Sequence, residues 1–320
     1  MRILITGVSG FVGGALGRYL QEACGFEVYG LSRSEGRPGS CGSFRSADLS
    51  LSVPFDLGRF DAVVHAAGLV TPWAHPEAYE RHNVRATANL LAFAKRSGAE
   101  QFIYISSSSV FYREGDQFGI SEATPFPDIP INAYAATKRR AEELVATSGL
   151  KTTILRPRAV FGEGDTVLFP RILRAARLGL LPRFSRPDGA RVIGDLVSID
   201  NLVHFVQAAL ERGAEGDFNL TDDAPVDIYE LLEAVLADFD LPAPKLSLPA
   251  PLVMRVAGSL EFLSARLFGW REPPLTRFGV SVLSQSKTFD IAKAKAGLGA
   301  PVIPTGEALA RFVAWQKARR

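Results

Sequence analysis

The sequence contains few residues of the kinds that build disulfide frameworks or metal centres, with two cysteines and four histidines among 320 residues. Cys24 and Cys41 have no metal-ligand spacing, and two cysteines do not make a disulfide framework. His75, His82 and His204 show neither ligand nor catalytic-triad spacing. We therefore expect no metal site and a reducing, cytoplasmic compartment.

The sequence also lacks a large net charge and a long uncharged run. Its net charge of +2 gives no indication of the concentrated basic face that nucleic-acid binding usually shows. No stretch of about 18 residues is free of charge, so a membrane-spanning helix is not expected. The apolar N-terminus is too short for a signal peptide. What remains is the composition of an ordinary globular protein, 47% hydrophobic and 22% charged.

One segment, residues 248–270, is rich in large apolar side chains and carries three charges, as an amphipathic helix does. We expect it to form a core helix or a lid over an apolar site. The alternative is peripheral contact with a membrane, because such helices can lie in the bilayer interface.

The N-terminus carries the pattern of a dinucleotide-binding turn. Residues 2–6 form an apolar run of strand length, a G-x-x-G-x-x-G turn follows at once, and residues 11–23 have a helical pattern. Glycines let the backbone approach a pyrophosphate, and the helix N-terminus offers unpaired N–H groups. The alternative is that Gly13 and Gly14 only permit close helix–strand packing. We predict a cofactor-binding turn made by Gly7, Gly10, Phe11, Val12 and Gly13.

The end of the second predicted strand, residues 27–33, indicates which dinucleotide is bound. An acidic residue there would favour NAD by holding the ribose 2′-OH, whereas an arginine accommodates the 2′-phosphate of NADP. Ser32 and Arg33 end this strand, with Arg37 close by and Glu35 the only acid. The sequence favours NADP over NAD, although Arg33 could instead stack on adenine or face water and Glu35 could take a ribose.

Strand-like runs alternate with helical patterns through the first half, which predicts an α/β fold with a Rossmann-type doubly wound parallel sheet. The strand candidates are residues 3–6, 27–31, 61–65, 101–106 and 151–155, with helices at 76–97 and 132–148. The order is less regular afterwards, with helices at 171–180, 201–211, 228–239 and 307–317, a short strand at 217–220 and a proline-rich loop at 242–251. We expect a dinucleotide-binding domain at 1–157. Residues 158–320 are expected to form a smaller, mostly helical substrate lobe, with some segments returning to the core.

Two further segments are predicted to contact the cofactor. The strand at 61–65 runs into Ala66, Ala67 and Gly68, whose small side chains would let a ribose or ring lie against the backbone. His65 is expected to be a packed strand residue rather than a catalyst. Asp48 and Leu49, at the end of a weak strand, could face the adenine.

The chemistry is indicated by Tyr134 and Lys138, which share one face of a predicted helix because they are spaced i and i+4. A nearby ammonium is expected to lower the pKa of the phenol, which could then exchange a proton with a carbonyl or an alcohol. Four serines, residues 106–109, lie upstream. The alternative for the Tyr–Lys pair alone is a surface tyrosine above a solvated lysine.

Together these residues resemble the extended short-chain dehydrogenase/reductase superfamily. The motifs carrying the resemblance are Thr6-Gly7-x-x-Gly10-x-x-Gly13, His65-Ala66-Ala67-Gly68, Asn83, Ser107, Tyr134-x-x-x-Lys138, Arg156-Pro157 and residues 197–201. The resemblance implies that Tyr134 is the acid/base, that Lys138 holds the ribose hydroxyls and lowers the Tyr pKa, that Ser107 binds the substrate oxygen, and that Pro157 lies near the nicotinamide. It also implies a homodimer formed through the helices at 76–97 and 132–148. Ser107 lies three residues before a Val110-Phe111-Tyr112 triplet that lacks the family's final glycine, so Ser108 is the next candidate.

The second half is similar to the 3β-hydroxysteroid and sterol dehydrogenase branch, through residues 155–165, 169–171, 275–280, 288–290, 292–294 and 298–299. This implies a secondary alcohol or ketone on a hydrophobic, sterol-like or long-chain 3-keto skeleton. One alternative is a nucleotide-sugar epimerase, dehydratase or reductase, although Ala159 and Gly194 occupy positions where such enzymes carry diphosphate-binding side chains. Arg158 or Arg191 could substitute for these. A non-catalytic cofactor-binding regulator is the third possibility, and the intact Ser107, Tyr134 and Lys138 set argues against it.

Overall fold

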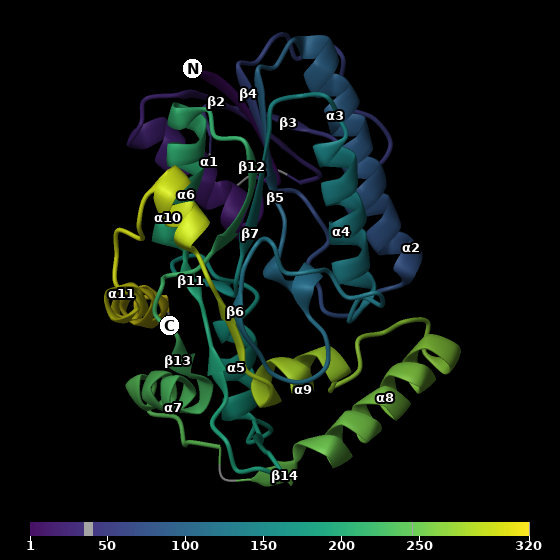
Figure 1. Ribbon diagram of the computed structural model, residues 1–320, viewed down its shortest axis with the longest axis vertical. Helices are drawn as coiled ribbons and strands as arrows, with labels where there is room; N and C mark the ends of the chain where they lie inside the picture. The colour runs from purple at the N-terminus through teal and green to yellow at the C-terminus, as the bar shows by residue number, and fades with distance from the viewer. Residues whose placement is uncertain (35–40, 245, 320) are drawn as a thin grey trace.

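The computed structural model describes residues 1–34, 41–244 and 246–319 (Figure 1). Its centre is a seven-stranded, entirely parallel sheet in the order β12-β7-β5-β4-β1-β2-β3. The predicted doubly wound sheet is therefore confirmed. The strands are β1 Arg2–Thr6, β2 Glu27–Ser32, β3 Ser43–Ser46, β4 Ala62–His65, β5 Gln101–Ile105, β7 Thr152–Pro157 and β12 Gly216–Leu220.

Helices cover both faces of the sheet (Figure 1). On one face α1 (Phe11–Glu22) packs against α6 (Ile199–Arg212), with α10 (Ala292–Leu298) beside them. On the other face α3 (Ala86–Ser97) packs against α4 (Ala133–Ala146). The central strands are buried on both sides, which explains why they read as nearly continuous apolar runs.

The predicted helix at 76–97 is interrupted. It consists of α2 (Pro76–Tyr79), a π-helical segment η1 (Glu80–Arg85) and then α3. The side chain of Asn83, inside η1, accepts a hydrogen bond from the Leu69 backbone N–H at 2.7 Å and donates to the Leu69 carbonyl oxygen at 3.2 Å. These tertiary bonds hold the wider turn against the loop that follows β4, and π-turns of this kind are frequent at functional sites.

A second lobe lies below the large sheet in Figure 1. Its helices are α5 (Phe169–Arg177), α7 (Ile228–Asp238), α8 (Ala250–Leu267) and α9 (Arg277–Ser284), and α11 (Thr305–Lys317) packs beside α7. A small sheet has the order β13-β10-β15-β6, formed by Val226–Asp227, Ile193–Gly194, Lys287–Phe289 and Gln117–Ile120. Two-stranded pairs join β8 (Val160–Phe161) to β11 (Val197–Ser198), and β9 (Arg183–Ser185) to β14 (Ser247–Pro249). A short 3₁₀ turn, η2 (Ser108–Phe111), follows β5.

The two parts of the sequence exchange strands. β12, from the second half of the chain, completes the large sheet by pairing with β7, and β6, from the first half, joins the small sheet by pairing with β15. Through the first exchange, residues 216–220 from the second half of the chain join the large sheet. The second was not indicated by the sequence, because residues 117–120 have no distinctive pattern.

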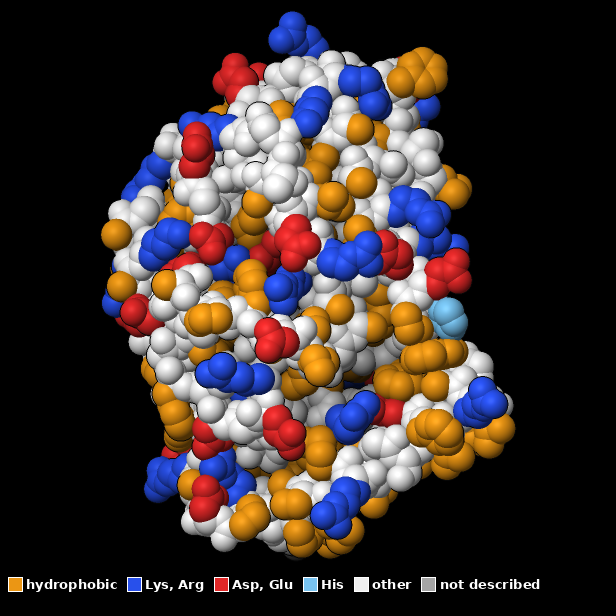
Figure 2. Space-filling model, turned by 45° about the vertical axis from the view of Figure 1, so that its right-hand side comes forward, with side chains coloured by type: hydrophobic (Ala, Val, Ile, Leu, Met, Phe, Trp, Pro, Cys, Tyr) orange, Lys and Arg blue, Asp and Glu red, His pale blue; other side chains and the backbone are white. Residues whose placement is uncertain are grey.

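Helix α8 accounts for most of the amphipathic segment at 248–270. Part of the predicted proline-rich loop is regular structure, because Pro249 ends β14 and Pro251 lies in the first turn of α8, where a backbone N–H has no helical partner. The helix buries one face and leaves large apolar side chains exposed on the other, visible at the lower right of Figure 2. These exposed residues are Leu252, Val256, Phe262, Leu263 and Leu267. Within the described residues, no helix is long and apolar enough to cross a bilayer.

Candidate active site and cofactor cradle

The glycine turn forms a tight cradle between β1 and α1. Gly7 has a φ of +78°, and a Cβ there would lie 2.9 Å from the Ala67 backbone. A Cβ on Gly13 would lie only 2.3 Å from the Gly7 carbonyl oxygen. Gly10 is the N-cap of α1 and provides no side-chain cap, so the first-turn N–H groups, beside Phe11 and Val12, are left for another acceptor. This arrangement fits a dinucleotide pyrophosphate.

A chain of hydrogen bonds fixes the strand ends beside this turn. Thr87 Oγ1 donates to the Asn83 carbonyl oxygen at 2.6 Å, so it accepts from His65 Nε2 at 3.0 Å. His65 Nδ1 must then accept from Thr6 Oγ1 at 2.7 Å, and Thr6 Oγ1 accepts from the Ala67 N–H at 3.1 Å. Burial lowers the pKa of His65 to about 3, and the neutral ring is fully buried, as predicted. His65 therefore holds the Ala67 backbone in place and makes no contact that would suit a catalyst.

Arg33, which follows β2, lies close to two residues from a distant part of the chain, Arg81 and His82. Arg33 Nη1 lies 3.5 Å from His82 Nε2, which is also 3.0 Å from Arg81 Nη2. Burial lowers the pKa of His82, and the two guanidiniums lower it further. Asp48 lies near this group, and a hydrogen bond from Ser50 lowers its pKa.

Of the other residues considered for cofactor binding or selectivity, two are buried and make hydrogen bonds within the protein, and two lie outside the described residues. Ser32 is buried and its hydroxyl donates to the Ser34 carbonyl oxygen at 2.6 Å. Leu49 is buried and its carbonyl oxygen accepts from Asn89 at 2.8 Å. Glu35 and Arg37 lie outside the described residues.

Tyr134 and Lys138 lie one turn apart on α4, which Asn132 caps by accepting the Ala135 N–H at 2.8 Å. Lys138 Nζ donates to the Ile105 carbonyl oxygen at the end of β5, at 2.7 Å. It also lies close to the cradle, because a Cβ on Gly68 would be 3.7 Å from Nζ. The helix and the sheet edge thus bring the Tyr–Lys pair to the segment that continues from β4.

The expected lowering of the tyrosine pKa is absent from this structure. Burial raises the pKa of Tyr134 to about 12, although the side chain keeps some solvent exposure, and the neighbouring Ser107 hydroxyl opposes the increase. Burial also lowers the pKa of Lys138 to about 8, opposed by the charge of Glu142. Removal of charged groups from water outweighs the i, i+4 attraction inferred from the sequence.

The four consecutive serines have different surroundings. Ser106 donates to Glu142, and Ser108 shares a hydrogen bond of 3.2 Å with the Tyr112 hydroxyl. Ser109 is buried, and its hydroxyl lies 2.9 Å from that of Ser107. Ser107 is the member of the run that is not buried, and it is the one that affects Tyr134.

A buried ion-pair network supports the site from behind. Arg156 binds Glu142 through Nη2 at 2.8 Å and Asp217 through Nη1 at 2.6 Å, and its guanidinium lies over the rings of Phe111 and Phe126. This network joins α4, β7 and β12. Arg156 and Glu142 are both buried, so removing either charge would leave the other less well compensated.

Several residues of this site were not predicted from the sequence. Thr87 had a usable signal, because it is spaced i+4 from Asn83 on the same helical face. Arg81 and His82 had none, since they approach Arg33 only through the fold. Pro157 is buried at the end of β7, and the next residue, Arg158, is buried without a hydrogen-bonding partner for its Nε among the described residues.

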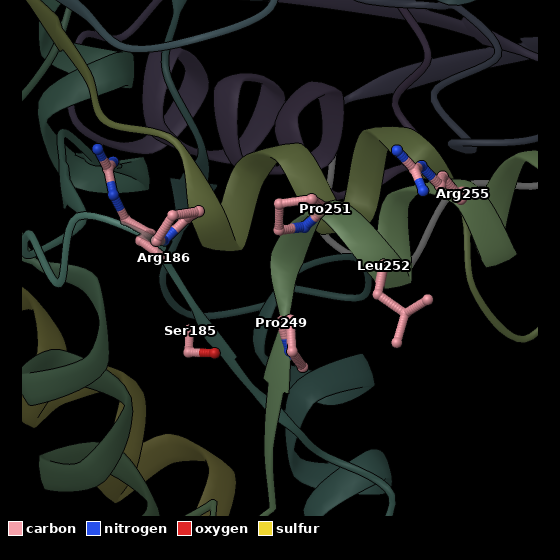
Figure 3. A pocket seen from close by; sticks show the side chains of 7 residues that line it. Ser185, Arg186, Pro249, Pro251, Leu252 and Arg255 are labelled. Atoms are coloured by element: carbon pink, nitrogen blue, oxygen red, sulfur yellow. The ribbon is translucent and has the colours of Figure 1, made fainter.

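A pocket of about 520 Å³ lies elsewhere, between β9 and the start of α8 (Figure 3). It is lined by Ser185, Arg186, Pro187, Pro249, Pro251, Leu252 and Arg255. No predicted site residue lines it. In Figure 3 Leu252 and Arg255 project from the same helix, with the arginine head well separated from Arg186.

Comparison with known proteins agrees with this arrangement. The sequence model of the NAD dependent epimerase/dehydratase family matches residues 3–221. A 2-alkyl-3-oxoalkanoate reductase from Shewanella oneidensis is 31% identical over 316 residues, covering 92% of this chain and 81% of the relative. A decarboxylating sterol-4-alpha-carboxylate 3-dehydrogenase from Candida albicans is 29% identical over 268 residues, covering 79% of this chain and 75% of the relative.

Solved structures show the same fold. UDP-glucuronic acid 4-epimerase from Bacillus cereus, in complex with NAD, superimposes with a TM-score of 0.74 at 22% identity, covering 100% of this chain and 99% of the other. The family model and the reductase each cover well over half of the sequence. The chain belongs to the NAD dependent epimerase/dehydratase family and is an enzyme of the extended short-chain dehydrogenase/reductase type.

Proposed function

We propose that this enzyme interconverts a ketone and a secondary alcohol on a hydrophobic substrate, using a nicotinamide dinucleotide held by the glycine turn. The observation that carries the proposal is the meeting of Ser107, Tyr134 and Lys138 at the sheet edge beside Gly68. When bound, the dinucleotide would supply or accept the hydride. We keep residues 1–157 as the dinucleotide-binding part and 158–320 as the part that contributes most substrate contacts.

Each side chain has a role that its surroundings support. Tyr134, with a pKa of about 12, is a neutral phenol near pH 7 and would donate its proton to the substrate oxygen during reduction. Ser107 would donate a hydrogen bond to the same oxygen as negative charge develops on it. Lys138, oriented by the Ile105 carbonyl, would hold the ribose hydroxyls and supply positive charge beneath Tyr134. Pro157 would begin the loop near the nicotinamide.

We propose NADP as the preferred cofactor. Arg33, Arg81 and His82 converge at the end of β2, and two guanidiniums suit a 2′-phosphate. The ratio of kcat/KM for NADPH to that for NADH should exceed one, and Arg81→Ala should reduce it mainly through the KM for NADPH. A wild-type preference for NADH would overturn this assignment.

The substrate class is supported by the relatives and by the aromatic wall near the site. The Shewanella protein is named for an oxoalkanoate and the Candida protein for a sterol carboxylate, both hydrophobic. Tyr112 stacks on Phe278 of α9, with ring centroids 6.4 Å apart, and also contacts Phe289. These rings bring apolar surface from the second lobe to the segment that carries Ser107.

The test uses Tyr134→Phe with long-chain ketones, hydroxysteroids and UDP-sugars. The wild-type enzyme should turn over the apolar substrates, and the variant should lose turnover while still binding NADPH, because the hydroxyl is removed and the ring is kept. Lys95→Met, on the distant end of α3, serves as a surface control. Turnover of UDP-sugars alone, or an active Tyr134→Phe variant, would contradict the proposal.

We further propose that α8 rests on an anionic lipid surface rather than acting as a fully covered core helix. Its exposed apolar row is flanked by exposed Arg255 and Arg266, and its single acid, Glu261, is buried and paired with Arg277 at 2.6 Å. The protein should float with phosphatidylglycerol vesicles and less with phosphatidylcholine vesicles. Phe262→Ser should weaken flotation, and equal recovery of wild type and variant would exclude the contact.

The remaining expectations concern the assembly and its compartment. We propose a cytoplasmic homodimer formed through the outer faces of α3 and α4, supported by the family resemblance and by the low cysteine count. Light scattering after gel filtration should give twice the mass of the chain, 34.6 kDa. A monomer at micromolar concentration would exclude it.

A further inference from the structure

Arg158 is a buried charge with no hydrogen-bonding or ionic partner among the described residues. It is 6% exposed, its Nε has no hydrogen-bond acceptor, and within the described residues its guanidinium forms no hydrogen bond or ion pair. An unpaired buried cation is costly, since its lost hydration is not replaced. The other buried arginine of the site, Arg156, is fully paired, so Arg158 is an exception that requires an explanation.

The position of Arg158 connects it to the proposed reaction centre. It follows Pro157 at the carboxyl end of β7, the edge at which ligands bind in open parallel sheets. Its Cζ lies 5.4 Å from the centroid of the Tyr112 ring. Tyr112 follows the 3₁₀ turn that begins after Ser107, and it is close enough to Tyr134 to influence that residue electrostatically. Tyr112 is thus a neighbour of both the acid/base and the Arg158 guanidinium.

Asp195 is close enough to Arg158 for their charges to interact, but the two form no ion pair. Asp195 accepts the Phe289 backbone N–H at 2.7 Å, and among the described residues it has no cationic partner within 4.0 Å. Burial raises the pKa of Asp195 to about 6, even though the charge of Arg158 opposes this. The guanidinium therefore keeps its bidentate donor edge for another anion.

We propose that Arg158 binds a carboxylate of the substrate, so that the substrate is a 3-oxo or 3-hydroxy acid on an apolar skeleton. This inference rests on the proposed function and narrows it. A planar guanidinium matches a carboxylate through two parallel hydrogen bonds. In the compounds for which both relatives are named, a carboxylate is attached to the carbon next to the one that bears the oxygen.

A single arginine fits a carboxylate better than a diphosphate. The other positions where a nucleotide-sugar enzyme would offer donors carry Ala159 and Gly194, and a Cβ on Gly194 would already be 3.8 Å from Arg158 Nη2. Two phosphate groups would be left with too few donors on burial. The reaction itself is unchanged, because the hydride goes to the oxo carbon, the Tyr134 proton goes to its oxygen, and the carboxylate stays intact.

The test compares the wild type and three variants on a matched substrate pair, a freshly prepared long-chain 3-oxo acid and its methyl ester. The wild type should prefer the acid. Arg158→Gln should lower kcat/KM for the acid by roughly 10- to 100-fold, mainly through KM, because a charged hydrogen bond contributes about 1.5–3 kcal/mol. The ester should change by less than about threefold, and Arg158→Lys should recover part of the loss. As a control, Arg96→Gln at an exposed position of α3 should match the wild type.

Several results would overturn the inference without touching the proposed function. These are equal turnover of acid and ester by the wild type, or equal losses on both substrates in Arg158→Gln. A thermal unfolding scan of each variant separates lost recognition from lost folding, and Arg158→Lys remains informative if Arg158→Gln is unstable. Failure of the wild type to reduce either compound would instead count against the proposed function.

Discussion

The most direct test of the cradle is the substitution Gly13→Ala. The added Cβ would lie 2.3 Å from the Gly7 carbonyl oxygen and 2.5 Å from its carbonyl carbon, both backbone atoms that cannot rotate away. Restoring an ordinary contact of at least 3.4 Å requires α1 and the turn to separate by about 1 Å.

Two effects of different size should follow. Overpacking at such a site costs about 1–3 kcal/mol of unfolding free energy, so the midpoint of thermal unfolding should fall by several degrees. Displacing the first turn of α1 by about 1 Å should weaken the reaction more strongly, since misplacement of that size can cost roughly 100-fold in rate. Fluorescence titration with NADPH, thermal unfolding and steady-state kinetics measure the three quantities separately.

A matched control is Gly306→Ala in the first turn of α11. Its added Cβ would meet no atom within 4 Å, and alanine is the better helix former by up to about 1 kcal/mol. This variant should unfold at the same or a higher temperature and bind NADPH normally. If Gly13→Ala bound NADPH within threefold of the wild type without loss of stability, the steric basis of the cradle would be wrong.

Three further predictions concern polar side chains in and around the site. His65→Asn should reduce the pH dependence of stability. The folded pKa of about 3 lies below the ordinary value of 6.5. The stability that this group contributes above pH 6.5 is therefore lost as the pH falls, by about 2 kcal/mol at pH 5. If urea unfolding at several pH values gave the variant the same pH dependence of stability as the wild type, the assignment of a neutral His65 would be wrong. Glu142→Gln should destabilise the protein by about 3 kcal/mol, whereas Glu143→Gln, in an exposed pair, should change it by less than about 1 kcal/mol, and equal midpoints in denaturant would contradict this difference. Ser107→Ala should lower kcat by about 100-fold with little change in NADPH binding, and full activity in single-turnover assays would remove this hydroxyl from the mechanism.

The local patterns of the sequence were enough to predict the central fold. The glycine turn, the alternating apolar runs and the i, i+4 spacing of Tyr134 and Lys138 depend on neighbours along the chain, and they survive in the structure. The helix predicted at 76–97 is confirmed in its bounds, but its π-helical stretch at 80–85 was not predicted, because the bonds from Asn83 to Leu69 join segments that are not adjacent in sequence.

Other properties depend on the finished environment and could not be predicted in the same way. The sequence spacing suggested a lowered pKa for Tyr134, but burial raises it, and burial is known only once the surrounding elements are in place. The same reason applies to Arg158, whose sequence neighbours give no sign that it is enclosed without a partner. The approach of His82 to Arg33 likewise requires the packing of η1 beside β2.

The strand exchange between the two sheets has a consequence for the order in which this protein can mature on the ribosome. The seventh strand of the large sheet, β12, ends at Leu220, and the small sheet gains β15 only at Phe289. A nascent chain that stops near residue 160 therefore exposes the open edge of β7. Residues 117–120, which form β6, remain without their partner strand β15 until residue 289 has been made. Such unpaired edges invite association with other chains, so shielding of the growing polypeptide should matter most while residues 160–220 are translated, when both edges are open.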